Sequence, residues 1–259
     1  MFQNIIARKP CSKLVDGLTT SSQLGRPSFE KALLQHARYL EALQECGCNV
    51  EVLDANEAFP DSVFVEDVAV LTPKVAVITR PGAKSRVGEI DLPDLHVAIY
   101  NYYRDRGVEE IKHPGTLDGG DVLMVGDHYY IGLSSRTNQE GANQLIAILN
   151  KYGMSGEAVQ VPESLHLKTS VSYLGNNTLL GWNEFKELEP FKKFAFITVD
   201  SLDELYCANS VEVNGTIIMP ANNPHTKAKL EGQGLKVREV DTSEFQKLDG
   251  GVSCLSLRF

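Results

Sequence analysis

The segment DVLMVGDHYYIGLS (121–134) decides the fold, because it contains two strand-like runs joined by the turn sequence Val-Gly-Asp. Apolar and polar residues alternate in these runs, as expected for half-buried strands. The same arrangement, opened by a polar residue, recurs in three further segments, which are DVAVLTPKVAVITRP (67–81), SVSYLGNNTLLGW (170–182) and SVEVNGTIIMP (210–220). We therefore predict four β-hairpins, of which Asn214-Gly215 gives the strongest turn signal.

A fifth opening, CLSLRF (254–259), reaches the last residue without a second strand, and FQNIIAR (2–8) could supply that strand. The openings at residues 67, 121, 170, 210 and 254 recur every 40–54 residues. Self-similarity at this period predicts a propeller or a closed array of repeats. Pairing the first strand with the last would close the ring and remove exposed edges. The alternative is an ordinary α/β domain whose hairpins resemble one another.

Helical patterns lie between the hairpins. Residues 28–46 predict an amphipathic helix that Ser28 caps and Gly47 ends, and its apolar face would contain Phe29, Leu33, Ala37, Leu40 and Leu43. Residues 137–152 predict a second helix, because Thr137 and Glu140 have capping-box spacing. Weaker helices are expected near 91–106 and 224–233. The alternation of helices and strands predicts an α/β fold, and the absence of a Pro/Gly/Ser-rich linker predicts one domain over residues 1–259.

The composition of the chain limits the classes of function that it can have. The chain has 259 residues, is 42% hydrophobic and carries a formal net charge of −9. This content excludes a mostly disordered chain, and the negative charge disfavours nucleic-acid binding. We expect no membrane span or signal peptide, because no apolar run is long enough. The odd count of five cysteines favours reduced thiols and a cytoplasmic location. Cys46 and Cys48 lack a matching ligand pair, so we expect no structural zinc.

A closed ring would gather polar side chains at its axis. The residues concerned are the openings Asp67, Asp121, Ser170, Ser210 and Cys254, with neighbours Asp61, Glu66, Asp118, His166 and Lys168. Unpaired buried carboxylates are costly, so a cation should fill the hollow, and a guanidinium matches carboxylates with its fixed fork of donors. Cys254 follows Gly250-Gly251 and is placed like a nucleophile. Each residue also has an ordinary structural interpretation: a buried thiol, a hydrogen-bonded histidine or an Asp-Gly-Gly turn.

The longest motifs resemble dimethylarginine dimethylaminohydrolases, which belong to the guanidine-modifying superfamily that includes arginine deiminases and amidinotransferases. The resemblance covers essentially the whole chain in order. Its motifs are FPDSVFVEDVAV (59–70), ITRPGAKSRVGE (78–89), TLDGGDVLMVGDHYYIGLSSRTN (116–138), LHLKTSVSYL (165–174) and DTSEFQKLDGGVSCLSLRF (241–259). It implies a pentein propeller, with five ββαβ-like units in a closed ring around a pseudo-five-fold axis.

The resemblance also implies roles for ten residues. Cys254 would be the nucleophile, His166 the general acid and base, and Asp118 the third member of the triad, where many relatives have Glu. The substrate-binding residues would be as follows: Glu66 and Asp67 for the guanidinium, Asp61 for the α-amino end or pocket, Arg86 and Arg136 for the α-carboxylate, Leu18 on a lid loop, and Leu248 through its carbonyl.

The implied reaction converts dimethylarginine or monomethylarginine to citrulline and an amine through a covalent Cys254 thiouronium. Cysteine and histidine supply the nucleophile and the proton relay, so we expect no metal and no cofactor. The expected partner is a small guanidinium substrate, with no nucleic acid and no membrane, and a homodimer is left open. Arginine deiminase or amidinotransferase activity on the same scaffold is the main alternative. A non-catalytic binding module would not need the triad and the paired arginines together.

Overall fold

The computed structural model describes residues 1–162 and 165–259, in which the strands form five sheets of three strands each. In every sheet the middle strand pairs antiparallel with one neighbour and parallel with the other. The sheets are β15-β1-β2 (Leu257–Arg258, Asn4–Arg8, Asn49–Leu53), β3-β4-β5 (Ala69–Leu71, Ala76–Ile78, Val108–Glu110), β6-β7-β8 (Val122–Val125, His128–Leu133, Ser155–Gln160), β9-β10-β11 (Val171–Tyr173, Thr178–Trp182, Ala195–Val199) and β12-β13-β14 (Val211–Val213, Thr216–Pro220, Lys236–Val240).

The predicted hairpins are confirmed, and so is the pairing of the two ends of the chain. Ile5 lies opposite Arg258 and Ile6 opposite Leu257, so the N-terminal segment supplies the partner of the last strand. At the turn between β12 and β13, Asn214 has φ 51° and Gly215 has φ 89°. Two successive residues with positive φ are what a tight type I′ hairpin requires, which is why Asn-Gly is favoured there.

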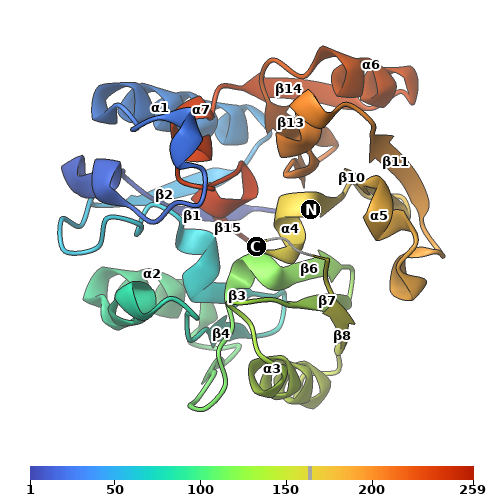
Figure 1. The fold of residues 1–259 in the computed structure, drawn as a ribbon. Helices are drawn as coiled ribbons and strands as arrows, with labels where there is room; N and C mark the ends of the chain where they lie inside the picture. Colours follow the sequence, from blue (N-terminus) through green and yellow to red (C-terminus); the bar gives the residue numbers. More distant parts are fainter. Residues whose placement is uncertain (163–164) are drawn as a thin grey trace.

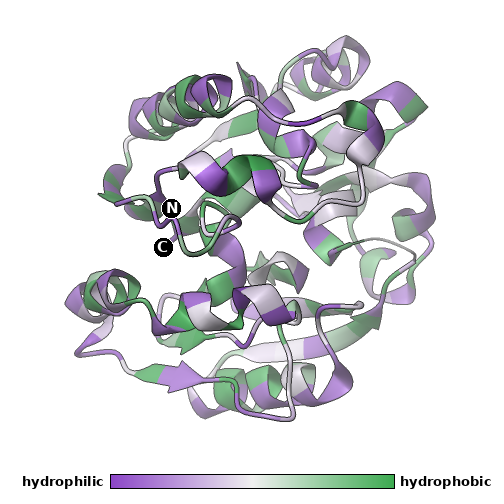
Figure 2. Cartoon of the chain, turned by 60° about the vertical axis from the view of Figure 1, so that its left-hand side comes forward, coloured by the Kyte–Doolittle hydropathy of each residue, from purple (hydrophilic) through white to green (hydrophobic). Residues whose placement is uncertain are grey.

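Helices connect the middle strand of each sheet to its parallel outer strand. They are α1 (Phe29–Glu45), α2 (Pro93–Tyr103), α3 (Gln139–Lys151), α5 (Asn183–Lys186) and α6 (Pro224–Gly232). The four predicted helices are therefore present. In Figure 1 the helices α1, α2, α3 and α6 lie at the outside of the molecule, while both termini lie near its middle. Figure 2 shows that hydrophilic and hydrophobic residues alternate around these outer helices, as expected for half-buried elements.

The buried face of α1 differs from the predicted one. Leu33 is 40% exposed and Ala37 is also exposed, whereas the buried face contains Ala32, Gln35, His36, Tyr39, Ala42 and Leu43. Gln35 on this face has partners elsewhere in the fold: it donates to Ser243 and accepts from the backbone N–H of Glu244. Satisfied polar residues can occupy a buried helix face, so counting apolar residues alone placed the face wrongly.

The cap of α3 is Asn138 rather than Thr137. The Asn138 side chain accepts from the backbone N–H of Gly141 at 2.8 Å. The Thr137 hydroxyl instead donates to Asp121 at 2.6 Å and accepts from the backbone N–H of Asp118 at 3.1 Å. Thr137 is thus committed to a polar network inside the molecule, and this is why the neighbouring residue caps the helix. Ser28 caps α1 as predicted, accepting from the N–H of Lys31.

Short helical turns precede or contain the polar residues that were expected at the starts of the first strands. These turns are η3 (Val65–Val68), η5 (Gly119–Asp121), α4 (Leu167–Ser170), η7 (Leu202–Ala208) and η8 (Ser253–Leu255). A tight helical turn presents successive side chains in different directions, so neighbouring residues can face different spaces. The remaining short segments are η1 (Ser12–Asp16), η2 (Ser22–Leu24), η4 (Lys84–Asp91), η6 (Glu189–Phe191) and α7 (Ser243–Gln246).

Apolar side chains in the described residues pack into five clusters. Tyr39, Tyr103, Tyr129 and Phe185 are among their largest fully buried members. All five cysteines lie in the described residues, and all are free thiols. Among the helices of residues 1–162 and 165–259, none has the length and apolar character needed to cross a bilayer.

Candidate active site

One cavity of about 220 Å³ brings together most of the predicted site residues. Cys254 and His166 both line it, although 88 positions separate them in the sequence. The other predicted residues that line it are Leu18, Asp61, Asp67, Arg86, Arg136 and Leu248. Asp118 lies behind His166, and Glu66 lies outside the cavity lining.

His166 is held by the carboxylate of Asp118. The imidazole Nε2 lies 2.9 Å from Asp118 Oδ2, and Asp118 is fully buried. The backbone N–H of Gly82 donates to the other oxygen of Asp118 at 2.8 Å. Burial alone would raise the pKa of Asp118, but the hydrogen bond and the charge of His166 lower it below its usual value. Asp118 therefore remains a carboxylate beside the ring.

Carboxylates surround the histidine on more than one side. Burial alone would lower the pKa of His166, but Asp67, Asp121 and Asp118 together raise it to about 9. Asp67 Oδ1 lies 4.0 Å from the imidazole Nε2. At neutral pH the ring is therefore protonated and can act as a proton donor.

The sequence Asp-Gly-Gly-Asp (118–121) needs both of its glycines because the chain packs tightly there. A Cβ at Gly119 would lie 1.9 Å from the backbone oxygen of Glu66, and a Cβ at Gly120 would lie 2.8 Å from His166 Nδ1. The backbone N–H of Gly120 donates to Asp67 Oδ1 at 3.0 Å. The absence of side chains at these glycines lets Asp67 and His166 approach the same turn.

Cys254 lies in the turn η8 and is 8% exposed. Burial, followed by the charges of Glu66 and Asp67, raises the pKa of its thiol to about 12. The backbone N–H of Gly251 points at the sulfur at 3.3 Å and favours the thiolate, but its effect is smaller. The thiol is therefore neutral at physiological pH.

The turn before Cys254 is held by two residues that the sequence did not reveal. The hydroxyl of Tyr206 donates to the carbonyl of Gly250 at 2.8 Å. The Asn209 side chain accepts from the backbone N–H of Ser253 at 2.8 Å and donates to its hydroxyl at 3.2 Å. Tyr206 and Asn209 come from another repeat, and no local motif marks them. Together they fix the backbone that presents the sulfur.

Two arginines line the cavity in different electrostatic settings. Arg86 is buried and bonds Asp67 at 2.5 Å and Glu89 at 2.7 Å, and it also donates to the carbonyl of Phe64 at 2.9 Å. Burial opposes its charge, but Glu89 and Asp67 raise its pKa well above the usual value. Arg136 is more accessible, with a 20% exposed side chain and Nη1 3.8 Å from Asp118. Arg136 is therefore the cation with more freedom to meet an anionic group.

The structure does not bring the Glu66 side chain into this cavity. Its Oε1 atom accepts from Lys168 at 2.7 Å and from Arg258 at 2.6 Å, and its Oε2 atom accepts from Ser253 at 2.7 Å. Burial would raise its pKa, but these cations and hydrogen bonds lower it. Glu66 and Asp67 are adjacent in sequence yet face different spaces, because both lie in the tight turn η3.

The segment around Leu18 lines the cavity, and hydrogen bonds to two aspartates hold it in place. The backbone N–H of Leu18 donates to Asp61 at 2.9 Å. Burial is the main reason that the pKa of Asp61 is raised. Thr20 and Ser21 donate to the carboxylate of Asp249, which directly follows Leu248. Leu18 itself remains 41% exposed, as expected for a residue on a covering loop.

Asp121 supports the site from behind. It accepts from the hydroxyls of Ser134 and Thr137 at 2.6 Å each and from the backbone N–H of Leu167 at 2.9 Å. The last bond fixes the backbone next to His166. The sequence shows Asp121 as the second Asp of Asp-Gly-Gly-Asp (118–121), and it shows Ser134 and Thr137 within Ser-Ser-Arg-Thr-Asn (134–138). It does not show that these two motifs contact each other.

Asp67, Asp118 and His166 also have potential metal-ligand atoms within 4.8 Å of one another. Asp67 is already paired with Arg86 and accepts from Gly120, while Asp118 accepts from Gly82 and pairs with His166. Hydrogen bonds and ion pairs thus account for this cluster without a metal ligand set being required.

Comparison with known proteins identifies the family. The model of the family N,N dimethylarginine dimethylhydrolase, eukaryotic, matches residues 22–182. The N(G),N(G)-dimethylarginine dimethylaminohydrolase of Pseudomonas aeruginosa is 51% identical over 259 residues, with both chains fully covered. The Streptomyces coelicolor protein of the same name is 37% identical, with 98% of this chain and 95% of the relative covered.

Solved structures agree with these matches. A cysteine-to-serine mutant of the Pseudomonas aeruginosa enzyme complexed with citrulline has a TM-score of 0.96 and 50% identity, with both chains fully covered. A histidine-to-glycine dimethylarginine dimethylaminohydrolase adduct with S-methyl-L-thiocitrulline has the same TM-score, identity and coverage. The N-terminal domain of ArgZ, at 24% identity and a TM-score of 0.84, shares the fold over 98% of this chain and 97% of that chain. The chain therefore belongs to the dimethylarginine dimethylaminohydrolase family.

Proposed function

We propose that this protein hydrolyses Nω-methylated arginines to citrulline and dimethylamine or methylamine. The observation that carries the proposal is the convergence of Cys254, His166, Asp67 and Arg136 on one cavity of about 220 Å³. A sulfur nucleophile, a protonated imidazole, a carboxylate for a cation and an arginine for an anion are the groups that hydrolysis of a zwitterionic guanidino acid requires. Family membership at 51% identity supports the same reaction.

The substrate is oriented by charge at both of its ends. The guanidinium lies beside Cys254, and Asp67 accepts its N–H donors, because a carboxylate–guanidinium pair fixes the plane of the reacting carbon. The α-carboxylate lies toward Arg136, supported by the buried charge of Arg86. The α-ammonium lies toward Asp61 and the backbone carbonyl of Leu248, and Leu18 covers the bound molecule.

The first half of the reaction forms the covalent intermediate. When the guanidinium binds, the Cys254 thiol loses its proton to solvent, and the thiolate sulfur adds to the guanidinium carbon and gives a tetrahedral adduct. Protonated His166 donates its proton to the methylated nitrogen, the C–N bond breaks, and dimethylamine or methylamine leaves. The remaining S-alkylthiouronium is attached to Cys254. Asp118 keeps the imidazolium oriented and stabilises its positive charge before the proton is transferred.

The second half restores the enzyme. His166, now neutral, takes a proton from a water molecule as that water attacks the thiouronium carbon. The C–S bond then breaks, the hydroxyl proton of the adduct returns to the departing sulfur, the former guanidinium carbon keeps the new oxygen as a carbonyl, and citrulline leaves. Asp67 stays beside the remaining nitrogens through both halves, so the charge that it balances does not have to be solvated again.

The substrate itself supplies the charge that activates the nucleophile. Without a bound cation the thiol is neutral, because burial and the charges of Glu66 and Asp67 raise its pKa to about 12. A bound guanidinium places a positive charge next to the sulfur, and an adjacent opposite charge favours the thiolate. The neutral resting thiol is correspondingly less reactive toward other electrophiles.

The fold supports this chemistry by gathering the repeats around one centre. We propose that the five units close into a ring around a pseudo-five-fold axis and form a single catalytic domain over residues 1–259. Pairing of β1 with β15 supports this closure, because it joins the two ends of the chain within one sheet. The site residues then come from the short turns that face the axis.

The direct test is product analysis with three substrates at equal concentration. We expect citrulline and dimethylamine from asymmetric dimethylarginine, citrulline and methylamine from monomethylarginine, and much slower citrulline release from arginine. Cys254→Ser is the matched control and should form no citrulline. Faster turnover of arginine than of either methylated substrate would instead identify an arginine deiminase, and amidine transfer to an added amine would identify an amidinotransferase.

A further inference from the structure

A second and larger cavity, of about 500 Å³, is lined by Lys168 and Arg258, the two cations that bind Glu66. The two cavities share no lining residue in the described part of the chain. Ser253 lines the larger cavity, while the adjacent Cys254 lines the smaller one. The volume is within the range of small-molecule sites, and none of the proposed catalytic steps uses this space.

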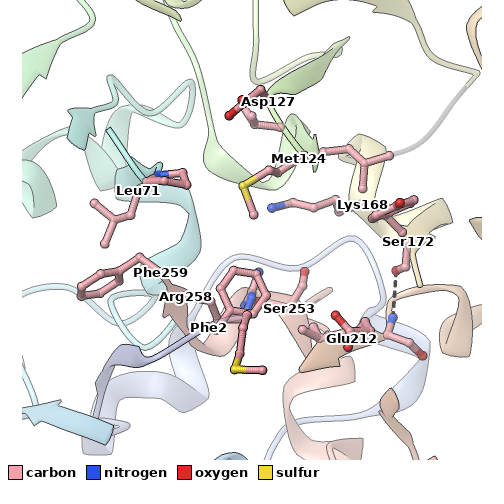
Figure 3. A pocket seen from close by; sticks show the side chains of 18 residues that line it. Phe2, Leu71, Met124, Asp127, Lys168, Ser172, Glu212, Ser253, Arg258 and Phe259 are labelled. Atoms are coloured by element: carbon pink, nitrogen blue, oxygen red, sulfur yellow. Dashed lines mark hydrogen bonds between the residues drawn. The ribbon is translucent and has the colours of Figure 1, made fainter. Parts of the chain in front are cut away.

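The walls of this second cavity are largely apolar. Phe2, Leu71, Met124, Val211 and Phe259 are among the lining residues, and they come from several repeats. Figure 3 shows Leu71, Met124 and Phe259 around an open space into which Lys168 extends. Two serines add polarity on one side, where the hydroxyl of Ser172 accepts from the backbone N–H of Ser210 at 3.0 Å. Such a lining suits a ligand with an apolar body and one polar end.

Two cationic side chains line this cavity. Lys168 and Arg258 both line it, with side chains that are 14% and 12% exposed. Both bind the same oxygen of Glu66, so two largely but not fully buried cations share one carboxylate, and the cluster keeps a net positive charge. An uncompensated buried charge is costly, and an anion that reached these cations would reduce that cost.

The acidic residues of the same lining do not cancel this charge. Asp127 is 65% exposed and pairs with Lys74 at 3.7 Å. Glu212 accepts from the backbone N–H of Gly215 at 2.6 Å, so its carboxylate turns to its own hairpin. In Figure 3 Asp127 and Glu212 lie on opposite sides of Lys168. Exposed charges are screened by solvent far more than the buried pair of cations is.

We propose that this second cavity binds a small monocarboxylate with an apolar body. Its carboxylate meets Lys168 and Arg258, and its hydrocarbon portion lies against Met124, Leu71 and Phe259. Arg258 also donates to the backbone carbonyls of Ser253 and Ser256 at 2.8 Å each, so its guanidinium is fixed and ready for an anion. The site is separate from the proposed active site and does not depend on the proposed reaction.

Octanoate is a suitable probe, because it combines one carboxylate with a flexible apolar chain. We expect saturable one-to-one binding by calorimetry, with a dissociation constant of about 1 mM or tighter. Octylamine should not bind, and octan-1-ol should bind at least about tenfold more weakly. Equal binding of octanol would show that the cations do not recognise the ligand and would overturn the carboxylate assignment.

The position of the probe can be read without substitutions. The protein has four methionines, of which Met1 and Met124 line this cavity, while Met154 and Met219 are buried elsewhere. With methyl-labelled methionine, octanoate should shift the Met124 resonance and leave those of Met154 and Met219 unchanged. Binding that leaves Met124 unchanged would place octanoate elsewhere and refute the proposal.

Three variants complete the test. Lys168→Met should weaken octanoate binding at least about tenfold by removing one cation, and Met124→Trp should weaken it similarly by filling the cavity. Arg136→Gln is the control, since Arg136 lines only the other cavity and octanoate binding should be unchanged. Unfolding curves verify that each variant is folded. Loss of binding in Arg136→Gln, or unchanged binding in both other variants, would contradict the second site.

Discussion

The imidazole Nε2 of His166 lies 2.9 Å from the carboxylate of Asp118, and both side chains are at least nine-tenths buried. A buried ion pair of this kind keeps the ring protonated to a pH well above its usual value, and here the pKa of His166 is raised to about 9. The pair therefore determines the pH range over which His166 is protonated.

Asp118→Asn should lower kcat about 100-fold and change KM little, because it removes the charge that orients and stabilises the imidazolium. The upper pH limit of kcat should also move to lower pH, since the pKa of His166 falls when Asp118 is neutral. Steady-state kinetics from pH 6 to 10 measure both effects. Asp118→Glu is the matched control and should keep the upper limit; an unchanged profile in Asp118→Asn would exclude the assigned role.

Binding of a guanidinium should ionise Cys254. Ultraviolet difference absorbance of the thiolate measures this directly when a non-reactive cationic arginine analogue is added at pH 7.5. We expect no thiolate signal from Cys254 without ligand, because its pKa is raised to about 12, and an increase on binding. Cys254→Ser corrects for the other four thiols. A fully ionised Cys254 in the free enzyme would refute substrate-assisted ionisation.

Glu66→Gln should destabilise the protein by about 3–5 kcal/mol, because it leaves Lys168 and Arg258 buried without their shared carboxylate. Urea unfolding measures the change in the free energy of unfolding. Glu189→Gln is the matched control: Glu189 is 85% exposed, pairs only with the surface residue Lys192 among the ion pairs of the described residues, and should change stability by less than about 0.5 kcal/mol. Equal effects of the two substitutions would contradict a stabilising ion-pair network of Glu66 with Lys168 and Arg258.

Asp249→Ala should loosen the segment that covers the cavity. It removes the carboxylate that accepts from Thr20 and Ser21, so we expect KM to rise about tenfold with a smaller change in kcat. Limited proteolysis within residues 17–25 should become faster. Asp249→Asn tolerates the same positive φ of 58° and keeps one acceptor, so its effect should be smaller. Unchanged KM and proteolysis in Asp249→Ala would show that Asp249 does not hold this segment over the cavity.

His36 should make the protein less stable in mild acid. It is buried against Phe245, and burial lowers its pKa from 6.5 to about 4. As pH falls from 6.5 to 4, the unfolded chain binds a proton at His36 that the folded chain does not, so the free energy of unfolding falls by about 3 kcal/mol. Urea unfolding across this range measures the loss. His36→Leu should reduce the pH dependence, whereas His225→Gln, at an exposed position, should not.

The hairpins could be predicted from sequence because their signals are local. Strand alternation and Asn214-Gly215 act within a few residues, and the recurring openings indicated that residues 2–8 would complete the last hairpin. The buried face of α1 could not be predicted in the same way. Gln35 and Tyr39 are polar, and only their distant partners Ser243 and Ser256 make them compatible with burial.

The candidate site shows the same division between local and distant information. The motifs that contain Cys254, His166 and Asp67 are continuous in sequence, and the structure places all three at one cavity. The opposite directions of Glu66 and Asp67 depend on the geometry of a short turn, which the motif alone does not reveal. Tyr206 and Asn209 hold the turn before Cys254 from another repeat, so no spacing within a motif could identify them.

The central claim is that Cys254 forms a covalent bond to the carbon of the substrate's guanidinium. Rapid acid quenching during turnover of asymmetric dimethylarginine, followed by intact-protein mass spectrometry and peptide mapping, tests it most directly. We predict an adduct equal to the substrate minus dimethylamine, located on Cys254. Citrulline formation with an adduct on another residue, or sustained turnover by Cys254→Ser, would contradict the account.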